Sequence, residues 1–137
     1  MDFDEFKILH SETIMYYQLI EHDLKLIYSY MLNGDIDENY DTIENITLGQ
    51  MVKKLKNLDN SDGKPLISSG DYNFLSQICK NRNLWAHNCF SSFMYIENWE
   101  KSKEYKKMCE KLGMDHDRVS KASDILEDIR IKYCTEL

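Results

Sequence analysis

Proline and glycine are scarce in this sequence of 137 residues, which contains one Pro and five Gly. So few turn-forming residues favour long helices over a turn-rich β fold. No apolar run approaches the roughly 20 residues of a membrane span, and no basic segment leads into an apolar one as in a signal peptide. The four cysteines show no Cys-x-x-Cys spacing. We therefore expect a cytoplasmic protein with reduced thiols that does not enter the membrane.

The motifs of common metal- and cofactor-dependent enzymes are also missing. There is no Gly-rich phosphate loop and no Ser-His-Asp pattern. The acidic run 35–46 begins like a calcium loop, but Tyr40 and Ile46 stand where Gly and Glu are needed. Glu21–Asp23 groups two acids with a histidine, yet consecutive residues point in different directions around a helix. We expect neither a metal nor a cofactor.

Charge is unevenly distributed along the chain, whose formal net charge is −7. Residues 1–50 hold eleven acids and two lysines, a net of −9, and residues 51–137 hold fifteen basic and thirteen acidic residues, a net of +2. The overall acidity argues against a general nucleic-acid coat. It leaves room for a small basic cleft in the second part and for a basic protein partner of the first.

Apolar periodicity predicts a single all-α domain over residues 1–137, an up-and-down bundle of about five helices. Residues 3–32 read as one long helix, with a core row at Phe6, Leu9, Thr13, Tyr17, Ile20, Leu24, Ile27 and Met31. Its broad apolar surface suggests burial on two sides, against its own bundle and against a second chain. We expect this helix to pack along the helix that carries residues 82–87.

Capping signals place most of the remaining helices. Thr47-x-x-Gln50 is a capping box that opens a helix over about 48–58, and Ser68-x-x-Asp71 is a second capping box that starts a central helix near 69–71. Further helices are expected over about 93–112, ended by Gly113, and over about 116–134. The acidic residues 35–46 are expected to form a loop.

The central helix carries the run Arg82-Asn83-x-x-x-His87. The guanidinium of Arg82 keeps its charge and matches a phosphate, and an imidazole such as that of His87 exchanges protons near neutral pH. These are the groups needed to cleave a phosphodiester without a metal. On an ideal helix, residues five apart are rotated by about 140°, so one chain places Arg82 and His87 poorly for a single phosphate. Two such helices crossing at a two-fold axis would bring both pairs to one cleft.

This helical order and the Arg82 to His87 run resemble the HEPN family, the higher eukaryotes and prokaryotes nucleotide-binding domains. Many members similar to this chain are homodimeric, metal-independent ribonucleases of toxin–antitoxin, abortive-infection and CRISPR systems. Their motif lines a cleft between two chains. Some pair with an antitoxin that modifies a Tyr two positions after the His, but that position here is Cys89. Other members lack nuclease activity and serve as interaction modules.

The resemblance implies an endoribonuclease in which the 2′-hydroxyl of RNA attacks the neighbouring phosphate. His87 would act as general base or acid, Arg82 would stabilise the charge on the phosphate, and Asn83 would position the phosphate or His87. DNA would not be cleaved, because it lacks that hydroxyl. Candidate contacts to the RNA backbone are Lys80, Lys53 and Lys54.

Two alternatives remain open. The chain could be a non-catalytic helical dimer that binds a protein or a nucleotide, with exposed aromatics such as Tyr40, Tyr95 and Trp99 at the interface. It could also be a structural subunit in which Arg82 pairs with an acid of the first helix, either Glu21 or Glu12.

Overall fold

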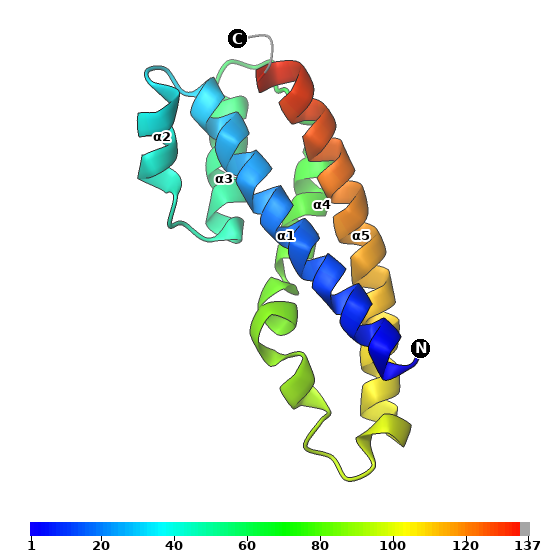
Figure 1. Cartoon of the computed structure of the whole chain (residues 1–137). Helices are drawn as coiled ribbons and strands as arrows, with labels where there is room; N and C mark the ends of the chain where they lie inside the picture. Colours follow the sequence, from blue (N-terminus) through cyan, green and yellow to red (C-terminus); the bar gives the residue numbers. More distant parts are fainter. Residues whose placement is uncertain (135–137) are drawn as a thin grey trace.

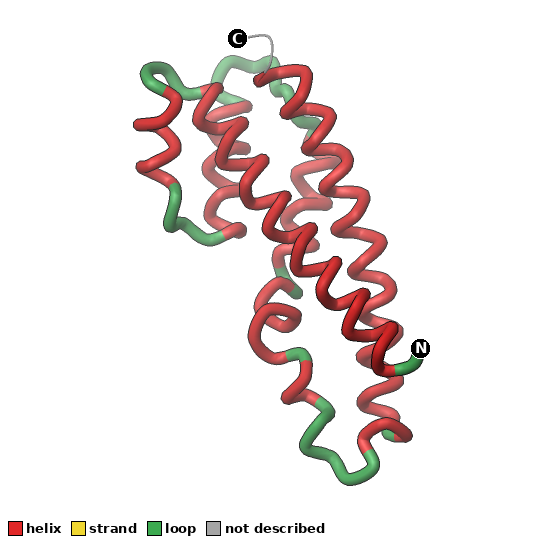
Figure 2. The backbone as a smooth tube through the Cα atoms, viewed as in Figure 1, coloured by secondary structure: helices red, strands yellow, loops and turns green. Residues whose placement is uncertain are grey.

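The computed structural model describes residues 1–134, and over this range it contains helices and turns but no strand. The predicted all-α fold with about five helices is thereby confirmed. Figure 1 shows their arrangement, and Figure 2 shows short helical pieces separated by loops at one end of the molecule. The α-helices are α1 (Phe3–Met31), α2 (Ile36–Ile43), α3 (Leu48–Asp59), α4 (Ser69–Cys79) and α5 (Lys103–Cys134). Three short turns join α4 to α5, namely η1 (Leu84–Asn88), η2 (Phe90–Ser92) and η3 (Trp99–Lys101).

The long helices α1 and α5 lie side by side along the molecule (Figure 1). Helix α1 begins at a capping box, in which Asp2 accepts the Glu5 amide at 2.8 Å. It ends before Gly34, whose φ of 108° suits glycine and few other residues. The partner of α1 was predicted to be the motif helix, but its main partner is α5, and it meets the motif mostly through individual polar contacts. None of the helices in residues 1–134 combines the length and apolar character that crossing a bilayer requires.

The core is one continuous cluster whose composition changes along the molecule. Around α2, α3 and α4 it is largely aliphatic, with Ile20, Leu24 and Leu55 fully buried. At the other end it is an aromatic cluster, made by Phe3, Phe6, Phe90, Phe93, Trp99 and Tyr105. Most of its ring pairs meet edge-on or tilted, such as Phe3 and Trp99 with 4.9 Å between centroids, and Phe3 and Phe6 are stacked. This cluster holds residues 90–102 in place without an α-helix.

The prediction of a loop over residues 35–46 is wrong, because α2 forms there. Asp35 caps α2 by accepting the Glu38 amide at 3.0 Å. The Asn39 side chain donates to the carbonyls of Ser29 and Leu32 at 3.0 and 3.1 Å. Those carbonyls belong to the end of α1, where a helix lacks its own acceptor partners. The acidic residues that suggested a loop serve as a cap and as solvent-facing positions of a helix.

The predicted boundaries after residue 79 are also wrong. Helix α4 ends at Cys79, residues 93–102 form turns, and Asn98 adopts a left-handed conformation with φ 53°. Helix α5 then runs through Gly113, which was expected to end it. A glycine inside a helix costs only about 1 kcal/mol. Burial of Leu112 and the hydrogen bonds that the buried Asp115 accepts from Trp85 and Asn81 outweigh that cost.

Candidate functional site

The backbone of the motif is not an α-helix. Arg82 and Asn83 begin a short helical segment that widens into a π-helical turn over Leu84–Asn88. Hydrogen bonds in such a turn join residues five apart instead of four, which brings positions five apart closer to one face. Single π-helical turns are rare and are frequent at functional sites.

A buried carboxylate on α5 anchors this turn. Asp115 accepts the indole N–H of Trp85 at 2.7 Å and the carboxamide N–H of Asn81 at 2.9 Å. Asp115 and Trp85 are almost fully buried, at 5% and 1% exposure. One carboxylate oxygen thus ties together the residue before Arg82 and a residue inside the π-helical turn.

A histidine on α1 holds the same turn from the other side. The Nε2 atom of His10 lies 2.7 Å from the Trp85 carbonyl oxygen. Because a carbonyl only accepts, the proton sits on Nε2. The His10 ring also meets the Phe90 ring edge-on, with 4.9 Å between centroids. Asp115 and His10 therefore hold Trp85 at two of its polar atoms, the indole N–H and the carbonyl oxygen.

Arg82 is held by α1. Its Nη2 atom donates to Glu21 Oε2 at 3.4 Å, a pair that the structural alternative anticipates. This distance exceeds the 2.7–2.9 Å typical of charge-assisted hydrogen bonds. The Arg82 side chain is 34% exposed, and its other N–H groups have no acceptor within residues 1–134. The guanidinium is thus positioned but largely available.

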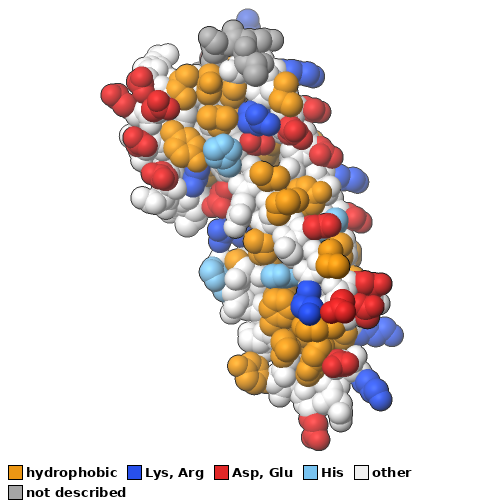
Figure 3. Space-filling model, viewed as in Figure 1, with side chains coloured by type: hydrophobic (Ala, Val, Ile, Leu, Met, Phe, Trp, Pro, Cys, Tyr) orange, Lys and Arg blue, Asp and Glu red, His pale blue; other side chains and the backbone are white. Residues whose placement is uncertain are grey.

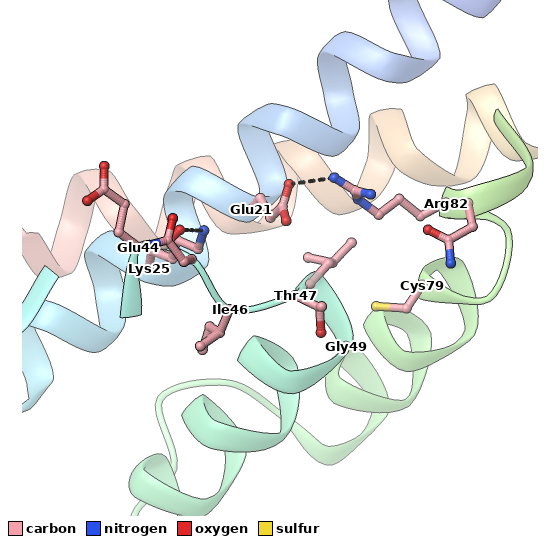
Figure 4. Close-up of a pocket in the computed structure, with 11 residues that line it drawn as sticks. Glu21, Lys25, Glu44, Ile46, Thr47, Gly49, Cys79 and Arg82 are labelled. Carbon is pink, nitrogen blue, oxygen red and sulfur yellow. Dashed lines mark hydrogen bonds and ion pairs between the residues drawn. The ribbon is translucent and has the colours of Figure 1, made fainter. Parts of the chain in front are cut away.

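Arg82 and Asn83 line a pocket of about 470 Å³ (Figure 4). Its walls come from α1, the connection into α3 and the end of α4. On the α1 side lie Glu21 and Lys25, and on the α4 side lies Cys79. Burial, and secondarily the charge of Glu21, raises the pKa of the Cys79 thiol to about 11. At neutral pH this cysteine is a thiol, so it is not a nucleophile.

His87 lies outside this pocket. Its side chain is exposed and makes no hydrogen bond or ion pair to the described part of the chain. The structure therefore brings Arg82 and Asn83 to one pocket and leaves His87 on the adjoining surface. The free imidazole has both nitrogens open to a ligand.

The three candidate lysines are dispersed and exposed. Lys53 and Lys54 lie on α3, and Lys80 follows the last residue of α4. Lys54 sits over the Tyr28 ring at 5.9 Å. None of the three lines the pocket of Arg82, so their expected contact with RNA stays a prediction.

Sequence reasoning missed Asp115, His10 and Lys25. A signal for Asp115 was present, because it continues the inward row of Leu112, Val119 and Ala122 at steps of three and four. A carboxylate in an apolar row needs a buried partner. No comparable pattern marks His10 or Lys25.

Within residues 1–134, no group of three or more His, Cys, Asp or Glu side chains is arranged to hold a metal ion. The adjacent residues Glu21–Asp23 contact three different partners. Glu21 meets Arg82, His22 meets the Tyr40 hydroxyl at 3.2 Å, and Asp23 pairs with Arg130 at 2.9 Å.

Comparisons of the chain with models of known protein families, with curated proteins and with solved structures gave no match.

Proposed function

We propose that the chain is a metal-independent endoribonuclease of the HEPN type that works as a homodimer in a toxin–antitoxin or phage-defence setting. One observation carries the proposal. Arg82 and Asn83 face a pocket, and the unpartnered imidazole of His87 lies on the π-helical turn that follows them. A fixed cation, a carboxamide and a free imidazole on one short segment supply phosphate binding and proton transfer.

In this mechanism the nucleophile belongs to the substrate. His87 removes the proton of a ribose 2′-hydroxyl, whose oxygen forms a bond to the adjacent phosphorus while the bond to the 5′-oxygen breaks. The leaving 5′-oxygen takes up a proton, from solvent or from a second His87 across the dimer. Arg82 stabilises the additional negative charge on the phosphate. The products are a 2′,3′-cyclic phosphate and a 5′-hydroxyl.

The contact between Arg82 and Glu21 fits a resting state. Partly exposed ion pairs contribute about 0–1 kcal/mol, and the 3.4 Å distance here favours the low end. A phosphate can take two parallel hydrogen bonds from one guanidinium, which is a stronger arrangement. RNA would therefore displace Glu21 from Arg82. A purely structural Arg82 would be expected to use more of its donors.

Surface area supports a dimer. The chain exposes 8531 Å², whereas a compact monomer of 16.3 kDa exposes about 7,500 Å². The excess is comparable to the roughly 800 Å² that each partner buries in a standard interface. Ile8, Met15 and Leu19 are exposed along α1. Figure 3 shows hydrophobic side chains recurring on the face where α1 runs.

The test is cleavage of single-stranded RNA in EDTA by wild type, His87→Ala and Arg82→Ala. We expect wild type to cleave and each variant to lose about 10²–10⁴-fold, the usual contribution of a general acid or base. The cyclic phosphate ends should be detected by mass spectrometry, and DNA should resist. Glu21→Gln should retain cleavage, with a lower KM for RNA because Arg82 is released.

His22→Ala is the matched control, because this exposed histidine lies on α1 outside the pocket. It should cleave like wild type. Cleavage that needs added magnesium, or that survives both the His87 and the Arg82 substitution, refutes the mechanism. Light scattering at micromolar concentration should give the mass of a dimer, and a monomer would contradict the two-chain site.

A non-catalytic binding module is the second candidate, favoured by one exposed apolar tip. Met94, Tyr95 and Ile96 are 42%, 90% and 36% exposed on the turn before η3. Of the other aromatics considered for an interface, Trp99 packs into the aromatic cluster and Tyr40 contacts His22. RNA binding without cleavage, or capture of a basic protein partner such as an antitoxin, would favour this function.

A further inference from the structure

The pocket beside Arg82 contains a second cation, Lys25, that no motif predicts. Lys25 lies on α1 and is 8% exposed. Its ammonium donates to the Glu44 carbonyl oxygen at 2.7 Å, which uses one of three N–H groups. It forms no ion pair with any residue from 1 to 134. Figure 4 shows the Glu44 side chain turned away from the pocket.

A buried ammonium that forms no ion pair is unfavourable, and Glu21, one turn earlier on the same helix, pairs with Arg82 instead. The energy is recovered when an anion is bound next to it, because the interaction is strong in a setting shielded from water. Lys25 thus differs from the exposed lysines of α3, whose charges are solvated. Its environment indicates that the missing partner is a ligand.

The opposite wall supplies matching donors. Arg82 has free N–H groups, and the Asn83 carboxamide has no partner in the described residues. The first turn of α3 also faces the pocket at Leu48 and Gly49, where helix amides lack internal acceptors. No atom lies within 4 Å of the place where a Cβ of Gly49 would be, so a ligand can approach this backbone. Glu21 is the negative charge in this pocket that opposes an anion. A bound anion would replace Glu21 as the partner of Arg82.

We infer that this pocket is a phosphate subsite, with Lys25 on one side of the anion and Arg82 and Asn83 on the other. Its volume of about 470 Å³ lies in the range of roughly 300–1,000 Å³ usual for small-ligand sites. The ligand is a phosphate ester, either a phosphodiester of RNA next to the scissile one or a free nucleotide. The RNA source rests on the proposed function, whereas the preference for phosphate rests on the pocket.

Calorimetry with two probes tests the subsite and separates the sources. One probe is a 2′-O-methyl RNA oligonucleotide, which lacks the nucleophile, and the other is adenosine 5′-monophosphate. We expect wild type to bind, and Lys25→Met to bind about tenfold more weakly or worse, since a hydrogen bond to a charged group is worth roughly 1.5–3 kcal/mol. Lys121→Met, on the exposed side of α5, is the matched control and should bind like wild type. Binding of the oligonucleotide assigns RNA, and binding of the monophosphate alone assigns a free nucleotide.

Two further measurements keep the test decisive if Lys25→Met fails to fold. Lys25→Gln removes the charge but keeps an N–H donor for the Glu44 carbonyl. In the unmodified protein, bound probe should shift the backbone amide NMR signal of Gly49, which lines the pocket, and should leave that of Gly113, which does not. Binding unaffected by both Lys25 variants, or no binding of either probe to wild type, overturns the inference.

The outcome is separable from that of the proposed function. His87 lies outside the pocket, so His87→Ala should lose cleavage and keep Lys25-dependent binding. Lys25-dependent binding in a protein that never cleaves RNA refutes the nuclease and supports the subsite. If the protein cleaves RNA but the Lys25 variants bind the probes as tightly as wild type, the subsite is refuted and the nuclease is not.

Discussion

Removing the carboxylate of Asp115 should loosen the motif and destabilise the fold. Asp115→Ala leaves the Trp85 indole N–H and the Asn81 carboxamide without their acceptor. Hydrogen bonds to a charged group are worth about 1.5–3 kcal/mol each. Loss of the hydrogen bond to Trp85 should cost close to 3 kcal/mol, because this side chain is 1% exposed and cannot reach water. Loss of the bond to Asn81 should cost less, because this side chain is partly exposed and can bond to water instead. The expected loss is about 3–5 kcal/mol, a large share of the roughly 5–15 kcal/mol that stabilises a typical domain.

Urea unfolding followed by far-UV circular dichroism measures this loss. Asp115→Asn keeps an acceptor oxygen and should lose only about 1–2 kcal/mol. Asp124→Ala, on the exposed side of the same helix, should change stability by less than about 0.5 kcal/mol. In an NMR spectrum of Asp115→Asn, the indole signal of Trp85 should shift and that of Trp99 should stay. A loss below about 1 kcal/mol for Asp115→Ala would refute the anchoring role.

Two further predictions concern stability. Gly113→Ala should raise the free energy of unfolding by about 0.5–1 kcal/mol, because no atom lies within 4 Å of the added Cβ and α5 continues through this position; unchanged or lower stability in urea would contradict it. Burial raises the pKa of Asp23 above its ordinary value of 3.8, despite Arg130. The raised pKa means that protonated Asp23 stabilises the folded state, fully below pH 3.8 and no longer once the pH has risen through the raised pKa. Wild type should therefore lose stability relative to Asp23→Asn as the pH rises over this window. Parallel stability curves of the two proteins from about pH 3 to 7 would contradict the shift.

Local signals in the sequence account for much of the helical framework. The 3/4 apolar row predicted α1 almost to the residue, and Thr47 and Ser68 cap α3 and α4 as expected. These features depend on neighbours within one or two turns. Periodicity and capping operate over that range, so they can be read without knowing the fold.

Periodicity and capping rules failed where contacts between residues far apart in the sequence determine the local structure. Residues 36–43 form α2, where Asn39 donates to carbonyls at the end of α1. Residues 93–102 look helical by composition, but the aromatic cluster holds them as turns. Gly113 does not end α5, because Leu112 before it and Asp115 after it are held in the core. In each case tertiary packing outweighs a local preference of about 1 kcal/mol or less.

The sequence by itself identified Arg82, Asn83 and His87 and named Glu21 as a possible partner of Arg82. Only the tertiary structure decided the shape of that segment and its surroundings. The π-helical turn is held by Asp115 and His10, which lie 30 and 75 residues from Trp85. Lys25 reaches the same pocket because α1 crosses the end of α4. Such meetings depend on how helices pack, and packing brings together residues whose separation along the chain carries no signal.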